Sequence, residues 1–351
     1  MEKFKHLFVI GNGFDLHHGI KSSYYDFCNW LKGDGYSSPN DMQLYNILTR
    51  VYHPRNQSLW SDLEFNLPLV GSFVINNNLN YSPLLLNINL GQSNQTIEMA
   101  IKTTMLNDDF HKNLGQSKSM VLENIMDEIG LSWDNLYARL YDSFNSWVLE
   151  LNETPINKDL SFPIENSHFI NFNYTNTLER VYSIPHDHIT YIHGCAHLQE
   201  ELIFGYNKSE LAIRNSFKRM LNWNERKNFI SSLLMLRKPI SKLIKKHREL
   251  WRLIRFADDV HIWGHGLGSV DLPYLCKIAE NMNNDAISEI SWFIKEDGKS
   301  EDQLICEALH EIAKITLHLK FIGFSNLRAK HLNSYKTRND SLYSSAYTKL
   351  Y

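Results

Sequence analysis

Four short apolar runs in this chain end near residues that can move protons or make hydrogen bonds. These residues, with their runs, are Asp15 after 6–10, Asn173 within 167–174, His193 near the end of 189–194, and His265 after 259–263. A histidine can act as acid or base near neutral pH, and an amide binds a ligand without adding charge. Such runs predict strands. Because ligands bind outside the carboxyl ends of strands in an open parallel sheet, these residues are the first candidates for a functional site.

The first strand end carries a Gly-x-Gly turn, in which Gly11 and Gly13 flank Asn12. Glycine can take positive φ and has no Cβ, so backbone N–H groups there could approach a phosphate at the start of the next helix. The third glycine of the dinucleotide fingerprint is missing, so a tight turn without a ligand explains the motif equally well. Farther on, Ser23 and Asp26 predict the N-cap and capping box of a helix.

The elements that must position these residues alternate between strand-like and helix-like patterns. This alternation predicts an α/β fold with a parallel sheet flanked by helices. Further strands are predicted at 202–206, 289–295 and 315–321, and helices at 176–182, from about 271, and at 300–313.

The segments between the strands predict large helical insertions and the following domain organisation. Residues 1–36 and 161–325 form the α/β nucleotide-binding core, 37–160 a helical insertion or subdomain, 208–256 a second helical insertion within the core, and 326–351 a loose polar C-terminal tail. Apolar spacing of three and four predicts helices at 41–48, 119–129 and 133–148, and the Asn-rich stretch 76–94 is predicted to be loop.

Composition indicates a soluble globular protein with no overall attraction to nucleic acid or anionic membrane. The 351 residues are 43% hydrophobic with a net charge of −3, which suffices for a core and gives no global basic character. No apolar run reaches the roughly 20 residues that cross a bilayer. The start of the chain lacks a signal-peptide pattern, and four scattered cysteines without CxxC spacing fit a reducing cytosol.

One segment, 218–255, is rich in basic residues. They are Lys218, Arg219, Arg226, Lys227, Arg237, Lys238, Lys242, Lys245, Lys246, Arg248, Arg252 and Arg255. We interpret them as a solvated helix face. A surface for phosphate or RNA is the alternative, although the three aromatic residues of this block are too sparse for a stacking platform.

A second cluster raises the question of a metal. His186, His188, His193, Cys195 and His197 crowd one predicted strand and its flanks, and imidazole and thiol groups are zinc ligands. Neighbouring positions on a strand face opposite sides, so these residues cannot all converge. We therefore predict no metal site.

Taken in order, several motifs resemble the AbiH family of bacterial phage abortive-infection proteins. They are 11–16, 19–27, 60–64, 172–175 with Leu178 and Glu179, 192–194, and 264–267 with Asp271. AbiH proteins in turn resemble the sirtuin-like group, so the fold that the resemblance implies is a sirtuin-like, Rossmann-like sheet. In that group an opening glycine motif binds the NAD phosphates, and an asparagine and a histidine serve cleavage of the bond between nicotinamide and ribose. Asn173 and His193 match those two residues.

The resemblance therefore implies an antiphage effector of the bacterial cytoplasm that binds NAD, or a related nucleotide, and cleaves its N-glycosidic bond. It assigns catalytic roles to Asn173, His193 and Asp15. The residues expected to contact the nucleotide are Gly11, Asn12, Gly13, Phe14, Trp60, Glu64, Tyr174, Gly264, His265 and Asp271. Besides the nucleotide ligand, a phage-derived trigger and a second copy of the chain are candidate partners; no membrane partner is expected.

The local chemistry is compatible with this hypothesis. A cationic pyridinium leaves with little acid assistance, so the site must mainly orient the substrate and stabilise an oxocarbenium-like ribose. Asn173 can orient ribose and water, His193 can take a proton if its pKa lies near neutrality, and Asp15 or Glu64 can face the developing cation.

Departures from the sirtuin-like pattern bear on the ligand. Asn12 and Asp15 stand where sirtuin-like proteins carry small residues. Tyr174 and Thr175 lack the aspartate that usually follows, and Gly266 replaces a serine. A carboxylate beside a pyrophosphate is unfavourable. Asp15 is therefore expected to face ribose, water or a cationic centre.

Structural roles are an alternative for each candidate. Asn173 could cap the next helix, His193 could bond a loop carbonyl in the core, His265 could be a turn residue, Trp60 could lie in the core, and Glu64 could be solvated. At the level of function, the alternatives to the enzyme are a non-catalytic nucleotide sensor and a nucleic-acid effector that uses the basic segment.

Overall fold

The computed structural model describes residues 2–33, 44–45, 48, 63–64, 67, 133–153, 160, 162–216, 231, 234–293 and 301–332. Trp60, the helix predicted at 119–129 and the loop predicted at 76–94 lie outside these residues. Of the helix predicted at 41–48, residues 44, 45 and 48 are described and helical.

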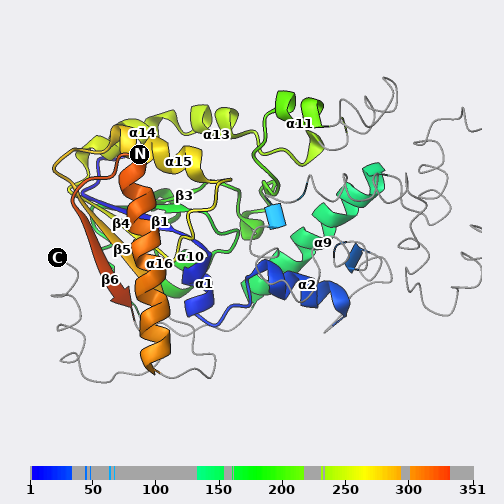
Figure 1. Ribbon diagram of the computed structural model, residues 1–351, viewed down its shortest axis with the longest axis horizontal. Helices are drawn as coiled ribbons and strands as arrows, with labels where there is room; N and C mark the ends of the chain where they lie inside the picture. Colours follow the sequence, from blue (N-terminus) through cyan, green and yellow to red (C-terminus); the bar gives the residue numbers. More distant parts are fainter. Residues whose placement is uncertain are drawn as a thin grey trace, which may run out of the picture.

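Among the described residues, six parallel strands form a single sheet in the order β3-β2-β1-β4-β5-β6 (Figure 1). The strands are β1 (His6–Ile10), β2 (Ser167–Asn171), β3 (Ile189–Tyr191), β4 (Asp259–Trp263), β5 (Ile287–Phe293) and β6 (Leu327–Leu332). The chain winds outward from β1 in one direction through β2 and β3, and in the other through β4, β5 and β6. This is the strand order of Rossmann-type sheets, which bind ligands where the winding direction changes, between β1 and β4.

Helices cover both faces of the sheet, as its central strands require. Leu7 and Val9 of β1 point to one face and pack with α13 (Ile240–Lys246), α14 (Arg248–Leu253), α15 (Leu272–Asn281) and α16 (Glu301–Phe321). Phe8 and Ile10 point to the other face and pack with α1 (Asn12–His17) and α10 (Thr177–Tyr182). In the described part of the chain, the connections contain the short 3-10 helices η2 (His186–His188), η3 (Ala196–Leu198) and η4 (Ile254–Phe256).

A third apolar cluster lies beside the sheet, where α2 (Tyr24–Lys32) packs against α9 (Trp133–Glu153) (Figure 1). Phe144 of α9 is fully buried and stacks on Phe204, with 4.3 Å between ring centroids. Helix α11 (Glu210–Ser216) also contributes Ile213 to this cluster. The predicted capping box at Ser23 and Asp26 is present at the start of α2.

The structure corrects three predictions. Residues 202–206 do not form a strand, and Tyr206 makes only an isolated bridge with Arg237. Residues 315–321 are the last turns of α16, not a strand. Strand β6 instead comes from residues 327–332, which were predicted to be loose tail. None of the helices in the described part of the chain has the length and apolar character needed to cross a membrane.

Candidate functional site

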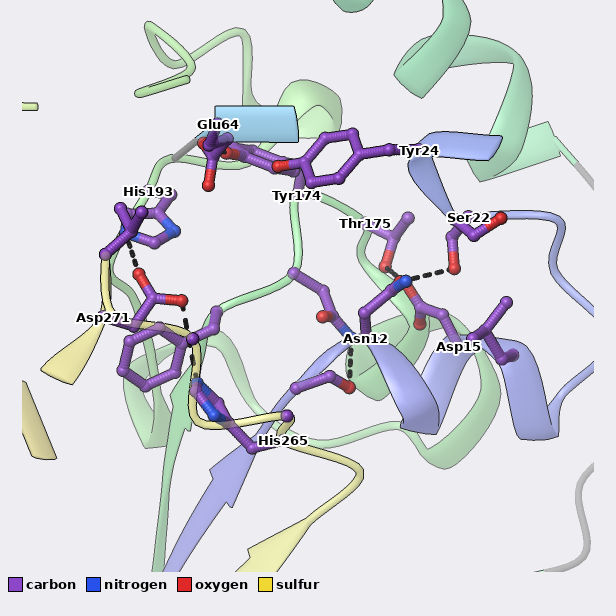
Figure 2. Close-up of a pocket in the computed structure, with 18 of the residues that line it drawn as sticks. Asn12, Asp15, Ser22, Tyr24, Glu64, Tyr174, Thr175, His193, His265 and Asp271 are labelled. Atoms are coloured by element: carbon purple, nitrogen blue, oxygen red, sulfur yellow. Dashed lines mark hydrogen bonds and ion pairs between the residues drawn. The ribbon is translucent and has the colours of Figure 1, made fainter. Parts of the chain in front are cut away.

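A cavity of about 550 Å³ lies at the carboxyl ends of β1, β2 and β4, where the winding of the sheet reverses. This volume is within the range of small-molecule sites, about 300–1,000 Å³. One part of its wall is apolar and comes from α9, through Phe144, Trp147, Val148 and Leu151. The rest carries polar and charged side chains, many of them from the loops that follow the strands and others, such as Tyr24 and Glu64, from helical segments (Figure 2).

Most of the residues that we predicted from the sequence converge here. Those that line the cavity are Gly11, Asn12, Asp15, Glu64, Asn173, Tyr174, His193, His265 and Asp271. Gly13, Phe14 and Gly264 are not among the lining residues. Phe14 is buried in the core on one face of the sheet.

The glycines of the first turn serve the packing of two turns against each other. Gly11 has a φ of −116°, so positive φ is not its role; the positive φ falls on Gly264, at +62°. A Cβ on Gly13 would lie 2.8 Å from Gly264 Cα, and one on Gly264 would lie 2.4 Å from Phe14 N. The N–H of Gly11 donates to Trp263 O and that of Gly13 to Gly264 O. Both N–H groups are therefore engaged inside the protein.

Asp15 ties the turn after β1 to the loop after β2. Its carboxylate accepts hydrogen bonds from Thr175 Oγ1 at 2.6 Å and Thr177 Oγ1 at 2.8 Å. Burial raises the pKa of Asp15, and the hydrogen bonds from the two threonines act against this rise. Both oxygens already have protein partners, so Asp15 supports the position of the neighbouring loop.

Asn173 projects from that loop. Its Nδ2 donates to Gly11 O at 3.1 Å, and its backbone N–H donates to Asn171 Oδ1 at 2.9 Å. The capping alternative is wrong, because the N-cap of α10 is Asn176. Two asparagines, one at the end of β2 and one just beyond it, thus fix the approach of the loop to the first turn.

A buried ionic cluster forms another part of the site. Lys238 Nζ lies 2.9 Å from Glu64 Oε1, 3.8 Å from Asp271 Oδ1 and 3.4 Å from His193 Nε2, and its side chain is fully buried. Glu64 also accepts the N–H of Gly205 at 3.0 Å. The alternative of a solvated Glu64 is therefore wrong.

Asp271 stands between two histidines (Figure 2). Its Oδ1 lies 3.4 Å from His193 Nε2, and its Oδ2 lies 3.9 Å from His265 Nε2. His265 also accepts the N–H of Leu267 at its Nδ1, at 3.1 Å. This bond places the proton of a neutral His265 on Nε2, toward Asp271.

Burial sets the protonation states of the cluster. It raises the pKa values of Glu64 and Asp271, while the nearby Lys238 ammonium acts to lower them. Burial and Lys238 together lower the pKa of His193 well below its usual value and that of His265 to about 4. The prediction that the pKa of His193 lies near neutrality is wrong, and both imidazoles are neutral at pH 7.

Two tyrosines complete the wall between the ionic and apolar parts. Tyr174 OH donates to Ile203 O at 3.1 Å and lies 3.3 Å from Glu64 Oε1. Burial raises the pKa values of Tyr24 and Tyr174 well above 10, so both remain neutral donors. Phe144 meets the Tyr174 ring edge-on at 5.0 Å. A planar heterocycle would find an aromatic surface here.

Sequence reasoning missed Lys238, which we assigned to a solvated helix face. The described members of the basic segment other than Lys238 are exposed, as predicted: Arg237, Lys242, Lys245, Lys246, Arg248, Arg252 and Arg255. Lys218, Arg219, Arg226 and Lys227 lie outside the described residues. Pro239 was the available signal, because proline interrupts a helix and so places Lys238 in a loop, where functional side chains concentrate.

Comparison with known proteins supports the family resemblance. No curated protein and no solved structure gives a significant match to the chain. The family model described as bacteriophage abortive infection AbiH matches residues 7–295, which include all six motif regions of the resemblance. The chain therefore belongs to the AbiH family of bacteriophage abortive infection proteins.

Proposed function

We propose that this protein is an antiphage effector that binds NAD or a related nucleotide in the cavity and hydrolyses its N-glycosidic bond. Membership of the AbiH family supports a role in abortive infection. The observation that carries the chemical proposal is the cluster of Glu64, Asp271 and two neutral histidines at the reversal point of a Rossmann-ordered sheet. Ligands of such sheets bind at this point.

The reaction needs stabilisation of positive charge on the ribose. The bond between ribose C1′ and the nicotinamide nitrogen breaks, and its electron pair leaves with nicotinamide. Glu64 and Asp271 are the carboxylates that would face the resulting oxocarbenium-like centre, because a nearby negative charge stabilises it in a desolvated site. Asp15 supports Asn173 through the loop in this scheme, because each of its oxygens accepts a hydrogen bond from a threonine of that loop or of the helix that follows it.

Water then adds its oxygen to C1′ and releases a proton. Asp271 lines the cavity, and burial raises the pKa of its carboxyl group, so its carboxylate can accept this proton and pass it to solvent. His193 remains neutral, and its Nε2, 3.4 Å from Asp271 Oδ1, positions this carboxylate. The Asn173 amide would orient the ribose hydroxyl groups and the water. Activation by a phage-derived trigger and assembly with a second copy of the chain, in the bacterial cytoplasm, belong to the same proposal.

The test is nicotinamide release from NAD by the purified full chain, measured chromatographically. We expect Glu64→Gln and Asp271→Asn each to lower kcat by about 10²–10³-fold, the usual effect of losing one transition-state electrostatic contact. Glu249→Gln removes an exposed carboxylate that pairs with Arg252, and it serves as the matched control. Infected cells should lose NAD with the wild type and keep it with Glu64→Gln.

A non-catalytic nucleotide sensor is the second candidate. Lys238 partly neutralises the carboxylates that the hydrolysis would need, and this observation favours binding without turnover. This function predicts that NAD raises the melting temperature while no nicotinamide appears under any activating condition. If NAD caused neither nicotinamide release nor a rise in the melting temperature, that result would contradict both candidates.

A further inference from the structure

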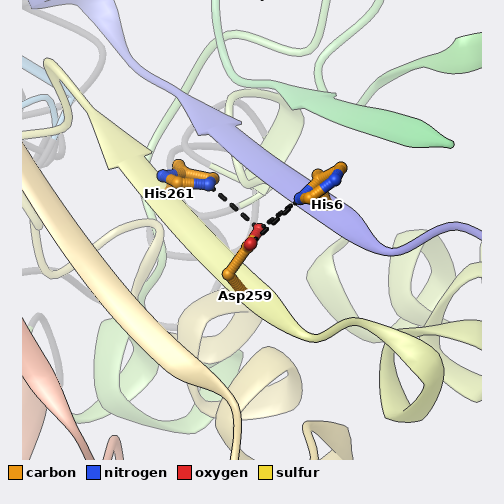
Figure 3. A group of neighbouring side chains, drawn as sticks. All are labelled: His6, Asp259 and His261. Carbon is orange, nitrogen blue, oxygen red and sulfur yellow. Dashed lines mark hydrogen bonds and ion pairs between the residues drawn. The ribbon is translucent and has the colours of Figure 1, made fainter. Parts of the chain in front are cut away.

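A group of metal-binding side chains lies at the opposite end of β1 and β4 from the cavity. His6 opens β1, Asp259 opens β4, and His261 is the third residue of β4 (Figure 3). We propose that these three residues bind a divalent transition-metal ion of the zinc class. The metal site and the proposed nucleotide site are independent: their residues lie at opposite ends of the same two strands.

The sheet register brings the three residues together. His6 and Asp259 are direct partners across the parallel pair β1 and β4. His261 lies two positions beyond Asp259 and so projects from the same face of the sheet. Residues separated by 253 positions in the sequence thus become neighbours, which is why no sequence motif reveals them.

The distances suit a shared ion. Asp259 Oδ1 lies 2.9 Å from His6 Nδ1 and 2.9 Å from His261 Nε2, and one ligand atom from each residue lies within 4.8 Å of the others. Ligand atoms bound to zinc at about 2.0–2.1 Å lie about 2.9–3.4 Å apart at octahedral to tetrahedral angles. Small side-chain shifts would place an ion between all three atoms.

Two neighbours orient the His261 ring. Glu289, its register partner on β5, places Oε1 3.4 Å from His261 Nδ1, and Phe8 stacks on the ring with 4.6 Å between centroids. A carboxylate near the second nitrogen of a ligating histidine favours the tautomer whose other nitrogen is free for the metal. His261 therefore presents Nε2 toward Asp259.

The types of ligand atom determine which class of metal ion the site would bind. Two imidazoles and one carboxylate suit zinc or another first-row transition metal, whereas Mg²⁺ and Ca²⁺ prefer oxygen ligands. The side chains of His6, Asp259 and His261 are 30%, 24% and 19% exposed. Water can thus reach the site to fill the remaining coordination positions, and the ion can exchange.

The test is zinc binding to the untagged, chelator-treated full chain by isothermal titration calorimetry. We expect saturable binding of one ion, lost in Asp259→Asn and in His261→Phe, which keeps an aromatic ring against Phe8. Glu289→Gln should weaken binding about 10-fold, as removal of a supporting carboxylate typically does. His186→Gln breaks a different 2.9 Å histidine–glutamate pair, and it should bind zinc like the wild type.

A second readout keeps the test independent of folding in the variants. Co²⁺ added to the wild type should produce visible absorption bands of a nitrogen- and oxygen-ligated ion, and excess Zn²⁺ should abolish them. The absence of stoichiometric zinc binding to the wild type, or its retention in both Asp259→Asn and His261→Phe, would overturn the proposal. The three side chains would then be a hydrogen-bonded cluster only.

Discussion

Lys238 decides the charge balance of the cavity at the scale of single residues. Its ammonium is fully buried and contacts Glu64, with Asp271 and His193 close by. A buried charge is costly unless it is paired, and removing one partner of a buried pair leaves the other uncompensated. Lys238 therefore holds two carboxylates in the cavity that burial alone would disfavour.

Replacing this lysine should destabilise the whole protein. We expect Lys238→Met to lower the free energy of unfolding by about 3–5 kcal/mol, because Glu64 and Asp271 lose their buried partner. Adding Glu64→Gln to this variant should recover part of the loss, since one of the two unpaired carboxylates is then gone. Urea denaturation at pH 7 measures the free energy of unfolding of the wild type, of Lys238→Met and of the double variant.

Lys242→Met is the matched control for this prediction. Lys242 is exposed on α13, four residues from Lys238, and an exposed substitution changes stability by within about 0.5 kcal/mol. Equal, small effects of the two methionine variants would show that Lys238 does not stabilise the buried carboxylates.

The sequence identified candidate site residues near the ends of predicted strands, but it did not identify the residues that contact them. Asn173, His193 and His265 follow apolar runs, so their meeting at one sheet edge could be predicted from the strand pattern. The contacts of Lys238 with Glu64 and of His6 with Asp259 could not be predicted, because tertiary packing sets them over long sequence separations. Spacing along the chain carries no information about such contacts.

At the scale of elements, the turns after β1 and β4 form one packed unit. Gly13 N–H donates to Gly264 O at 2.8 Å, and each glycine lies where a Cβ would meet the other turn. The unit fixes the spacing between the two strand ends on which the cavity is built. Its glycines are thus required for close backbone approach.

This packing predicts a sharp contrast between two glycines of one loop. Gly264→Ala places a Cβ 2.4 Å from Phe14 N at a φ of +62°, so we expect a loss of about 3 kcal/mol or more from strain and displaced backbone. Gly266→Ala meets no atom within 4 Å, and should change stability by within about 0.5 kcal/mol. Thermal and urea denaturation of both variants measure the contrast, and similar losses would contradict the packed-turn account.

The predictions of strands and helices were confirmed where the apolar pattern fitted only one type of element. The central strands and the helix within 133–153 were clear because long or strongly apolar patterns are distinctive. Residues 315–321 were mistaken for a strand because a short apolar run fits either state, and the spacing of Ile312, Ile315 and Leu319 makes it part of α16. Strand β6 was missed because it is an edge strand that contains Arg328 and Lys330, a composition typical of protected edges.

At the scale of the whole molecule, buried titratable groups couple stability to pH in two directions. Asp15, Glu64 and Asp271 have raised pKa values, so the folded state takes up their protons at higher pH than the unfolded chain and gains stability on acidification. His168 and His265 have lowered pKa values, so acidification protonates the unfolded chain first and removes stability. The net pH profile is the sum of these opposing contributions.

His168 allows one contribution to be separated from that sum. Burial lowers its pKa from 6.5 to about 3, and its Nε2 lies 2.8 Å from Thr190 Oγ1, far from the cavity carboxylates along β2. Its stabilising effect is therefore complete above pH 6.5 and is lost as the pH falls toward 3. Between pH 7 and pH 5, linkage gives a loss of about 2 kcal/mol from this residue alone.

His168→Gln should remove that loss, because glutamine does not titrate and its amide can still bond Thr190. We expect the unfolding free energy of the wild type to fall by about 2 kcal/mol more than that of His168→Gln between pH 7 and pH 5. The exposed His186→Gln should follow the wild type. Because the cavity carboxylates are common to all three proteins, their opposing contribution cancels in the comparison. Parallel pH profiles for His168→Gln and the wild type would mean that the pKa of His168 is the same in the folded and unfolded states.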